Sequence, residues 1–350
     1  MDRRTYLKSA AGATAGAGLA GCLGGGGGGG DGNDSSGGSN ESGGDTTESS
    51  GDTTEGGETE TASGNESMDE TETASGNESM AGNESGNASA GDMELPDQVS
   101  IGSDIPYRPF EFRTTENDEL TGFDVDIAEA VFKDQLGIVP DGDSMNSVFQ
   151  DTSFDTIIAS LNNGNFRVIM SAMTINDERD QEVDFSDPYF TAYQTIIVLE
   201  NSDISAKADL QGETVAVQKG TTGAGAAEGL KEEFGGDLTI KRYDQIPAAF
   251  DALTNNQAVA VINDNTVNGE FANQEGSGAR FVEGEGAAAN ASANATGSGS
   301  PPPYLTLTVE EYGIAFREDD DAFLERVNEA LATIREDGTY EEIYSEYFGG

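Results

Sequence analysis

Histidine is absent from this chain of 350 residues, and cysteine occurs once, as Cys22. One cysteine cannot form a disulfide within the chain. Metal sites and nucleophilic dyads depend largely on histidine and cysteine side chains, so we expect no metal, no cofactor and no such nucleophile. Long hydrophobic runs are missing as well. Because no stretch of 18 or more apolar residues occurs, the sequence predicts no membrane-spanning helix.

Positive charge is scarce. The chain has 17 Lys and Arg residues against 66 Asp and Glu residues, which gives a formal net charge of −49. Nucleic acids need a basic protein face, so this balance argues against nucleic-acid binding. The acidic excess continues into the part expected to fold, for example at 318–321, and resembles that of haloarchaeal proteins, in which high salt screens the repulsion. The alternative is an acidic tail on an ordinary domain, which accounts only for residues 31–92.

Aromatic residues, lysine and arginine are all absent from residues 23–95. This segment is dominated by Gly, Ser, Thr, Asn, Asp and Glu. Such a composition buries too little apolar surface to offset the entropy of an ordered backbone. The sequence therefore predicts a disordered acidic tether here.

The first 22 residues have the features of an export signal. Arg3 and Arg4 open a segment that resembles the twin-arginine motif, and residues 19–22, Leu-Ala-Gly-Cys, resemble a lipobox, in which the cysteine thiol receives a lipid. We therefore expect a lipoprotein anchored through Cys22 to the extracellular face of the cell membrane, with no other membrane contact. The alternative is an accidental or buried cysteine near a cleavage site.

Short apolar runs alternate with helical periods from Val99 onward, which is typical of an α/β protein. The predicted strands are 99–104, 168–173, 195–199, 214–217, 239–243, 258–263 and 312–317. The predicted helices are 123–136, 155–161, 223–234, 248–256 and 322–336. A terminal helix is expected to begin with a capping box formed by Thr339 and Glu342. Residues 284–303 are rich in Ala, Asn, Gly, Ser and Pro and predict an exposed low-complexity loop.

Six segments in order along residues 97–349 carry a family resemblance. They are IGSDIPYRPFE (101–111), LTGFDVDI (120–127), SAMTINDER (171–179), VDFSDPY (183–189), VQKGTT (217–222) and GTYEEIY (338–344). Together they resemble the family 3 extracellular solute-binding proteins, the amino-acid receptors of ABC importers. The resemblance implies an α/β, two-lobed fold of the type II periplasmic-binding-protein kind, with a hinge and a central ligand cleft. Residues 97–199 and 310–350 would build one lobe, and residues 200–309 the other.

The resemblance also implies a pocket for a free amino acid, which carries a carboxylate and an ammonium group. Arg179 matches the position that pairs with the ligand carboxylate, which a guanidinium group binds through two parallel hydrogen bonds. Asp264 matches the aspartate that holds the ammonium group, helped by the backbone carbonyl of Ala172. The alternatives are a solvated arginine in a turn for Arg179 and a helix N-cap for Asp264.

Three threonines complete the implied site for the carboxylate of the ligand. Thr174, Thr221 and Thr222 match positions that add hydroxyl or backbone donors. Thr221 and Thr222 also precede a predicted helix, whose N-terminus favours an anion. Without the resemblance, a Gly-Thr-Thr turn would be interpreted as an ordinary loop.

Three further residues are implied contacts for the ligand side chain. Tyr107 and Phe154 match positions that hold it between two aromatic faces, and the alternative for Phe154 is an ordinary core residue. Asp104 matches a position that touches the distal end of the ligand, and the alternative is a turn cap. Asp104 and the nearby Arg108 favour a ligand with a polar side chain.

The implied function is that of the extracytoplasmic substrate-binding component of an ABC importer. The protein would be a monomer that closes around a free amino acid and delivers it to the permease. Two alternatives stay open: a receptor that signals to a chemotaxis transducer, and a cyclohexadienyl or arogenate dehydratase-like enzyme with a general acid in the same cleft. We expect no enzyme, because the ligand-binding residues are intact and histidine is absent. Without histidine, binding is predicted to be nearly independent of pH between about 5.5 and 8.

Overall fold

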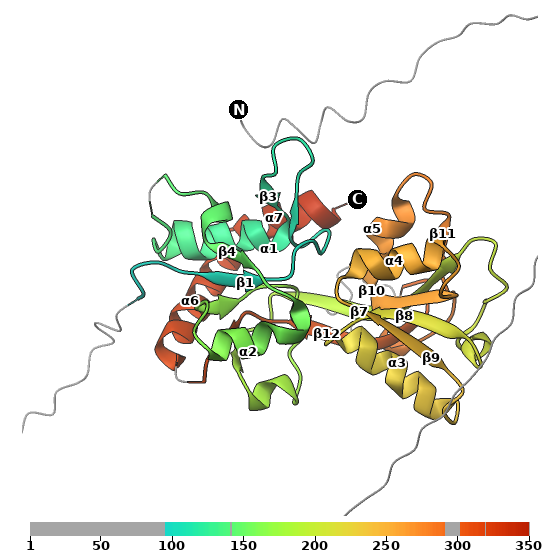
Figure 1. The fold of residues 1–350 in the computed structure, drawn as a ribbon. Helices are drawn as coiled ribbons and strands as arrows, with labels where there is room; N and C mark the ends of the chain where they lie inside the picture. The colour runs from blue at the N-terminus through green and yellow to red at the C-terminus, as the bar shows by residue number, and fades with distance from the viewer. Residues whose placement is uncertain (1–94, 141, 291–301, 319, 350) are drawn as a thin grey trace, which may run out of the picture. The chain divides into compact units, whose positions relative to one another are not determined.

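The computed structural model describes residues 95–140, 142–290, 302–318 and 320–349 (Figure 1). The predicted signal, the lipid-anchor residue Cys22, the tether as far as residue 94 and the loop residues 291–301 lie outside the described residues. Within the described ranges, no helix combines the length and the apolar character that crossing a membrane requires.

The first lobe is built on a five-stranded sheet with the order β4-β1-β5-β13-β6. Strand β1 runs parallel to β4 and β5, whereas β13 runs antiparallel to β5 and β6. A small hairpin of β2 and β3 precedes α1. Helix α1 then continues as a π-helical segment, Glu129–Gln135. The elements are β1 (Ile101–Ser103), β2 (Phe112–Arg113), β3 (Leu120–Thr121), α1 (Phe123–Ala128), β4 (Phe149–Asp151), α2 (Ile157–Asn162), β5 (Val168–Ile169), β6 (Asp184–Phe185), β13 (Ala315–Phe316), α6 (Asp321–Glu336) and α7 (Thr339–Phe348).

The second lobe is built on a six-stranded sheet with the order β11-β7-β10-β8-β9, in which β12 pairs with β7. Figure 1 shows α3 on one face of this sheet and α4 and α5 on the other. Because helices cover both faces, each central strand carries a buried apolar run, residues 215–217 in β8 (Thr214–Gln218) and 260–262 in β10 (Ala260–Asp264). The elements are β7 (Phe190–Leu199), β8 (Thr214–Gln218), α3 (Thr222–Glu233), β9 (Thr239–Tyr243), α4 (Ile246–Thr254), β10 (Ala260–Asp264), α5 (Asn265–Asn273), β11 (Ala279–Phe281) and β12 (Thr306–Tyr312).

Strands β7 and β12 connect the two lobes (Figure 1). They pair antiparallel from Phe190 opposite Tyr312 to Thr195 opposite Thr306. By strand pairing, β7 belongs to the second sheet from its first residue, and β12 stays in that sheet to its last. The predicted lobe boundaries at 199/200 and 309/310 instead place all of β7 in the first lobe and divide β12 between the lobes. Those boundaries stay a prediction, and the pairing assigns both strands to the second sheet.

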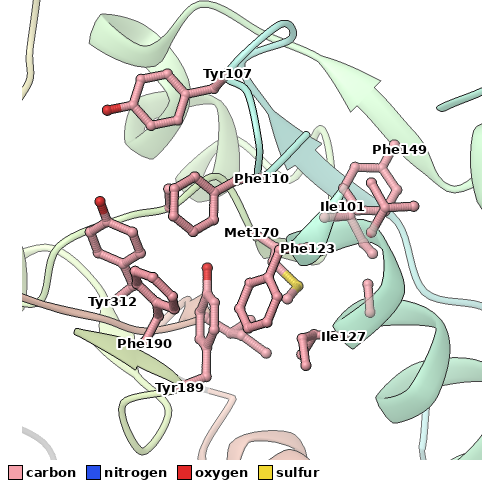
Figure 2. Packing of buried hydrophobic residues seen from close by; sticks show 14 of the residues in the cluster. Ile101, Tyr107, Phe110, Phe123, Ile127, Phe149, Met170, Tyr189, Phe190 and Tyr312 are labelled. Carbon is pink, nitrogen blue, oxygen red and sulfur yellow. The ribbon is translucent and has the colours of Figure 1, made fainter. Parts of the chain in front are cut away.

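An aromatic cluster fixes the ends of these connecting strands in the core of the first lobe. Figure 2 shows Phe110 beside Phe123, Phe190 and Tyr312. The Phe110 ring centroid lies 5.1 Å from that of Phe190 and 5.3 Å from that of Tyr312, both in edge-to-face arrangements. Such pairs add about 0.5–1.5 kcal/mol each beyond the burial of their surface. The first residue of β7 and the last of β12 are thus held by side chains from the first lobe.

The helix predicted at 322–336 illustrates how the apolar spacing is used. It forms as α6, and the residues at helical spacing, Phe323, Val327, Leu331 and Ile334, are all buried. The predicted elements are found, with shifted bounds. The largest shifts are that β5 ends at Ile169, whereas β7 begins five residues before the predicted strand at 195–199.

Three local predictions are wrong. The terminal helix α7 begins at Thr339, but its N-cap is Gly338 at φ +88° and no side chain caps it, so the capping box does not form. The strand predicted at 312–317 is two strands, because the chain leaves the second sheet after Tyr312 and enters the first at Ala315. Ala288, expected in an exposed loop, is fully buried, and its N–H donates to Thr306 Oγ1 at 2.8 Å.

Candidate functional site

One cavity lies where the two lobes meet, and all nine residues predicted as ligand contacts line it. Its volume is about 10 Å³, which is roughly the space for one water molecule. Ser171 and Gln218 line it too and were not predicted. The nine predicted residues are Asp104, Tyr107, Phe154, Ala172, Thr174, Arg179, Thr221, Thr222 and Asp264.

The topology of the sheets brings these residues together. Asp104 follows β1, Gln218 ends β8 and Asp264 ends β10, while Thr221 is the N-cap of α3. β1 and β5 are parallel neighbours in one sheet, and β8 and β10 in the other. The carboxyl ends of neighbouring parallel strands meet at one edge of a sheet, which is where α/β proteins form ligand crevices.

Arg179 is held between the lobes. Its side chain is 8% exposed, so the solvated-arginine alternative is wrong. Nη1 donates to the Thr174 carbonyl oxygen at 2.7 Å, and Nη2 donates to the Gly220 carbonyl oxygen at 3.1 Å. The guanidinium carbon lies 5.2 Å from the centroid of the Phe154 ring. Burial lowers the pKa of Arg179 from its ordinary value, and the charges of nearby carboxylates, Glu310 first, oppose that shift.

Asp264 occupies the N-cap position of α5, but its side chain makes no capping hydrogen bond. Its carboxylate instead accepts from Tyr107 Oη across the cleft and from Gln194 Nε2 at 2.5 Å. Burial and the charge of Glu310 raise the pKa of Asp264 to about 7, against the opposing effects of the Tyr107 and Tyr312 hydroxyls and of the Arg179 charge. The second lobe therefore presents a buried carboxyl group that an ammonium ion would stabilise in its ionised form.

Asp104 joins the lobes at another corner of the cavity. Oδ2 accepts from the Phe154 N–H at 3.0 Å and from Gln218 Nε2 at 2.6 Å, and Oδ1 accepts from Gln245 Nε2 at 3.3 Å. These donors are far from Asp104 in sequence, so the carboxylate does not cap a local turn. Burial raises the pKa of Asp104 to about 6, against the effect of the hydrogen bonds it accepts.

The hydroxyl protons of the three threonines are all committed within the protein. Thr174 and Thr222 donate to Glu310 Oε2, each at 2.7 Å. Thr221 donates to the Gln218 carbonyl oxygen at 2.9 Å and accepts from the Ala224 N–H in the first turn of α3 at 3.2 Å. A hydroxyl group has one proton to donate. In this arrangement the three hydroxyls can therefore only accept hydrogen bonds from a ligand, which leaves the backbone as the donor.

Ala172 has a strained backbone with φ +47°, a region that residues other than glycine seldom occupy. Its N–H donates to Asp124 Oδ2 at 2.8 Å, and the Tyr189 hydroxyl donates to the same oxygen at 2.9 Å. Asp124 is fully buried, and burial raises its pKa to about 7. A buried carboxyl group thus supports the unusual conformation of the peptide whose carbonyl was predicted to face the ligand.

Sequence reasoning missed two residues of the connecting strands, Gln194 and Glu310. Gln194 Nε2 reaches both Asp264 and Glu310, so it joins the two carboxylates. No sequence signal marks Gln194, because β7 also carries Thr191 and Thr195 near it and its apolar run begins only at Ile196. Glu310 is 7% exposed and lines a neighbouring cleft of about 530 Å³, which shares Arg179, Thr221 and Thr222 with the cavity. Nothing in the acidic surroundings of Glu310 in the sequence marks it.

Comparison with known proteins supplies the family. The profile of the bacterial extracellular solute-binding proteins, family 3, matches residues 99–350. The chain is 30% identical over 251 residues to a probable histidine-binding protein of Neisseria gonorrhoeae, which covers 71% of this chain and 82% of that protein. It is 29% identical over 256 residues to the ABC transporter glutamine-binding protein of Bacillus subtilis, covering 72% and 81% respectively.

A solved structure of an ancestral arginine-binding protein bound to glutamine is similar to this chain, with a TM-score of 0.61 and 33% identity. The match covers 73% of this chain and 100% of that one. The fold is accordingly the two-lobed type II fold of periplasmic binding proteins, as predicted. By the profile match over its folded part and by this relatedness, the chain belongs to the bacterial extracellular solute-binding proteins of family 3.

Proposed function

We propose that this protein captures a free amino acid outside the cytoplasm and delivers it to the permease of an ABC importer. The observation that carries the proposal is the cavity that Arg179 lines from the first lobe and Asp264 lines from the second. A free amino acid carries a charged group for each of these residues, a carboxylate for Arg179 and an ammonium group for Asp264. The relatives support the proposal, because they are named as histidine- and glutamine-binding proteins, one of them of an ABC transporter.

The site would bind the two charged groups of the ligand separately. Arg179 would pair with the carboxylate, and Asp264, with the carbonyl of Ala172, would hold the ammonium group. The side chain would lie between Tyr107 and Phe154, which line the cavity from the first lobe.

Entry of the ligand requires the lobes to separate. A cavity of about 10 Å³ does not accommodate an amino acid. The hydrogen bonds that now join the lobes, such as Arg179 to Gly220 and Tyr107 to Asp264, use the groups that a ligand would use. We propose that β7 and β12 act as the hinge, so that a monomer opens and closes around the ligand.

The far end of the cavity favours a side chain that donates hydrogen bonds. Asp104 offers a carboxylate there, and the amide groups of Gln218 and Gln245 are within hydrogen-bond distance of it. Histidine, glutamine and arginine all carry side-chain N–H groups, and these are the amino acids named in the relatives and the similar structure. We infer a polar amino acid of this kind, bound without turnover.

The test is a thermal-unfolding screen of the mature protein with each of the twenty amino acids in molar salt. A ligand at a hundred times its dissociation constant stabilises the folded state by about 2.7 kcal/mol. We expect one or a few polar amino acids to raise the unfolding temperature. Stabilisation by none of the twenty would contradict the proposal, and turnover of prephenate or arogenate would favour the enzyme instead. Binding without any effect on uptake would favour the chemotaxis receptor.

We further propose that the protein is exported by the twin-arginine pathway, anchored by a lipid on Cys22 and adapted to high salt. The support is the sequence alone: Arg3-Arg4, the single cysteine after small residues, and the net charge of −49. Changing Cys22 to Ser should release the protein into the medium or block its maturation. A Cys22→Ser protein that matures normally and stays on the membrane would contradict the anchor.

A further inference from the structure

Glu310 is the meeting point of both lobes and the hinge. Its Oε2 accepts from Thr174 Oγ1 of the first lobe and Thr222 Oγ1 of the second, each at 2.7 Å. The same oxygen accepts from Gln194 Nε2 of β7 at 3.3 Å, while Oε1 accepts from Thr308 Oγ1 at 2.7 Å. All four partners donate, so the carboxyl group of Glu310 acts purely as an acceptor.

The two threonines lie between Glu310 and the cavity. Thr174 and Thr222 line the cavity, whereas Glu310 does not. The two hydroxyl oxygens lie 3.3 Å apart, and Thr222 Oγ1 also accepts from Gln194 Nε2 at 3.2 Å. Each hydroxyl makes its shorter contact, 2.7 Å, with Glu310, and with its one proton directed there it has only lone pairs left for the cavity side. A lone pair attracts an ammonium group and repels a carboxylate. The direction of the Thr174 and Thr222 hydroxyl protons therefore decides whether these hydroxyls can bind the ammonium group or the carboxylate of an amino acid.

We propose that Glu310 is a positioning residue that turns the Thr174 and Thr222 hydroxyls into acceptors for the ligand's ammonium group. This inference rests on the proposed function, because it assigns parts within the same amino-acid site. It gives Glu310 a role in selectivity: the site requires an α-ammonium group and rejects an otherwise identical acid without one. The carboxylate is then left to Arg179 and to backbone N–H groups.

The location of Glu310 supports this role over a purely structural one. It is 7% exposed, and a buried carboxylate is costly unless donors surround it. Strand β12 continues past it to Tyr312, whose backbone pairs with Thr174, so the strand and the threonine are held in register. Gln194 donates to both Glu310 and Asp264, which ties Glu310 to the carboxylate proposed to bind the same ammonium group.

The experiment compares each amino acid with its analogue that lacks the α-amino group. The pairs are L-arginine with 5-guanidinopentanoate, L-glutamine with glutaramate, and L-histidine with imidazolepropanoate. Calorimetric titration of the full mature protein identifies the pair in which the amino acid binds. The measured quantity is the ratio of the two dissociation constants. If none of the twenty amino acids binds to the wild-type protein in the thermal-unfolding screen, the proposed function fails and this inference fails with it.

The first variant is Thr174→Val, which keeps the shape of the side chain and removes only the hydroxyl group. An acceptor hydroxyl contacts the ammonium group alone, so the affinity for the amino acid should fall about tenfold while that for the analogue stays within about twofold. If the hydroxyl donates to the carboxylate, both ligands lose affinity equally. That second result would overturn the inference.

The second and third variants are Glu310→Gln and Glu310→Leu. The amide oxygen of glutamine still accepts the two hydroxyl protons, but leucine accepts neither, so the ratio should fall about tenfold in Glu310→Leu and only about threefold in Glu310→Gln. Glu311→Gln is the matched control, because Glu311 is the exposed neighbour on β12, and its ratio should not change. If Glu310→Leu does not fold, the glutamine variant and Thr174→Val decide. An unchanged ratio in both would overturn the inference, as would equal falls in the leucine and glutamine variants.

Discussion

The first lobe supplies the cation of the site and the second lobe supplies its carboxyl group, and the two are held in different ways. Arg179 lies in a 3-10 turn, Arg179–Gln181, and reaches across to the Gly220 carbonyl of the second lobe. Asp264 lies at a regular junction of β10 with α5 and is met by Tyr107 from the first lobe. Each lobe thus uses its charged group to contact the other lobe.

The difference between the two lobes shows why ligand binding is coupled to closure of the cleft. The first lobe holds its site through irregular loops, including the left-handed Ala172 supported by the buried Asp124. The second lobe presents strand ends and the start of α3, which need no such support. An amino acid that satisfies Arg179 and Asp264 together replaces contacts between the lobes with contacts through itself. Three kinds of change test this coupling. They are removal of a charged group from either lobe, a change at the contact between the lobes, and a change in the charge of Asp264 with pH.

The largest effect is expected from removing either charge. In Arg179→Ala or Asp264→Asn, one charged group of the ligand would be buried without a partner, which costs about 2–5 kcal/mol, or roughly thirtyfold to several thousandfold in affinity. Arg179→Lys should also bind poorly, because a point charge does not replace a two-pronged guanidinium group. Calorimetric titration measures the affinities.

Arg167→Ala is the control for these charge changes. Arg167 pairs with Asp320 at 2.8 Å and is not among the residues that line the cavity. Its loss should leave affinity within about twofold, because this partly buried ion pair lies away from the residues that line the cavity. If Arg179→Ala and Asp264→Asn both bind within about threefold of wild type, the two lobes do not divide the ligand's charges as proposed.

An intermediate effect is expected from Gly220→Ala, which acts on the contact between the lobes. A Cβ at Gly220 would lie 2.8 Å from Asp155 Cα of the first lobe, and the backbone there has φ +72°. The clash hinders closure, and we expect a loss of about 1–3 kcal/mol of binding free energy, or roughly fivefold to a hundredfold in affinity. Small-angle scattering with and without ligand should show a smaller change in dimensions than in wild type.

Gly212→Ala is the matched control for Gly220→Ala. Gly212 has φ +83° in the same lobe, but an added Cβ would meet only Asp237 oxygens at 3.8 Å. It therefore carries the same kind of backbone strain without a contact between the lobes. Both variants should lose thermal stability, and only Gly220→Ala should lose affinity. Equal affinities in the two variants would mean that closure does not depend on this contact.

The smallest effect is expected from pH. The pKa of Asp264 is raised to about 7, and the ligand's ammonium group pairs with the ionised form. Affinity should therefore be highest above pH 7 and fall about tenfold between pH 8 and pH 6, as the carboxyl group takes up a proton. Titration with L-arginine or L-glutamine measures this, because their charges do not change in that range. In Asp264→Asn the dependence should largely disappear above pH 6.

This pH dependence replaces the flat profile predicted from the absence of histidine. That prediction assumed ordinary aspartate pKa values, whereas burial raises the pKa values of Asp264 and Asp104 to about 7 and about 6. The pKa of Asp104 extends the expected loss of affinity below pH 6. A profile that stays flat from pH 8 to pH 6 would show that Asp264 is ionised throughout, and would restore the original prediction.

Much of the fold was predictable because it depends on local pattern. The spacing of Phe323, Val327 and Leu331 already predicts α6, and the alternation of strands and helices predicts an α/β protein. The resemblance of the short sequence segments also identified residues that lie together, because all nine implied residues line one cavity. Their roles as ligand contacts stay predictions. The capping box at Thr339 failed because the left-handed Gly338 begins the helix without a side-chain cap.

The class of fold, the family and nine of the eleven residues around the cavity could be predicted from the amino-acid sequence, since these depend on apolar spacing and on short motifs. That Gln194 and Glu310 meet at the site became known from the fold alone, because the paired residues of β7 and β12 are more than 110 positions apart in sequence. The tertiary structure also decided the direction of the Thr174 and Thr222 protons and the raised pKa of Asp264. Proton direction and pKa depend on burial and on partners from both lobes, which no local pattern specifies.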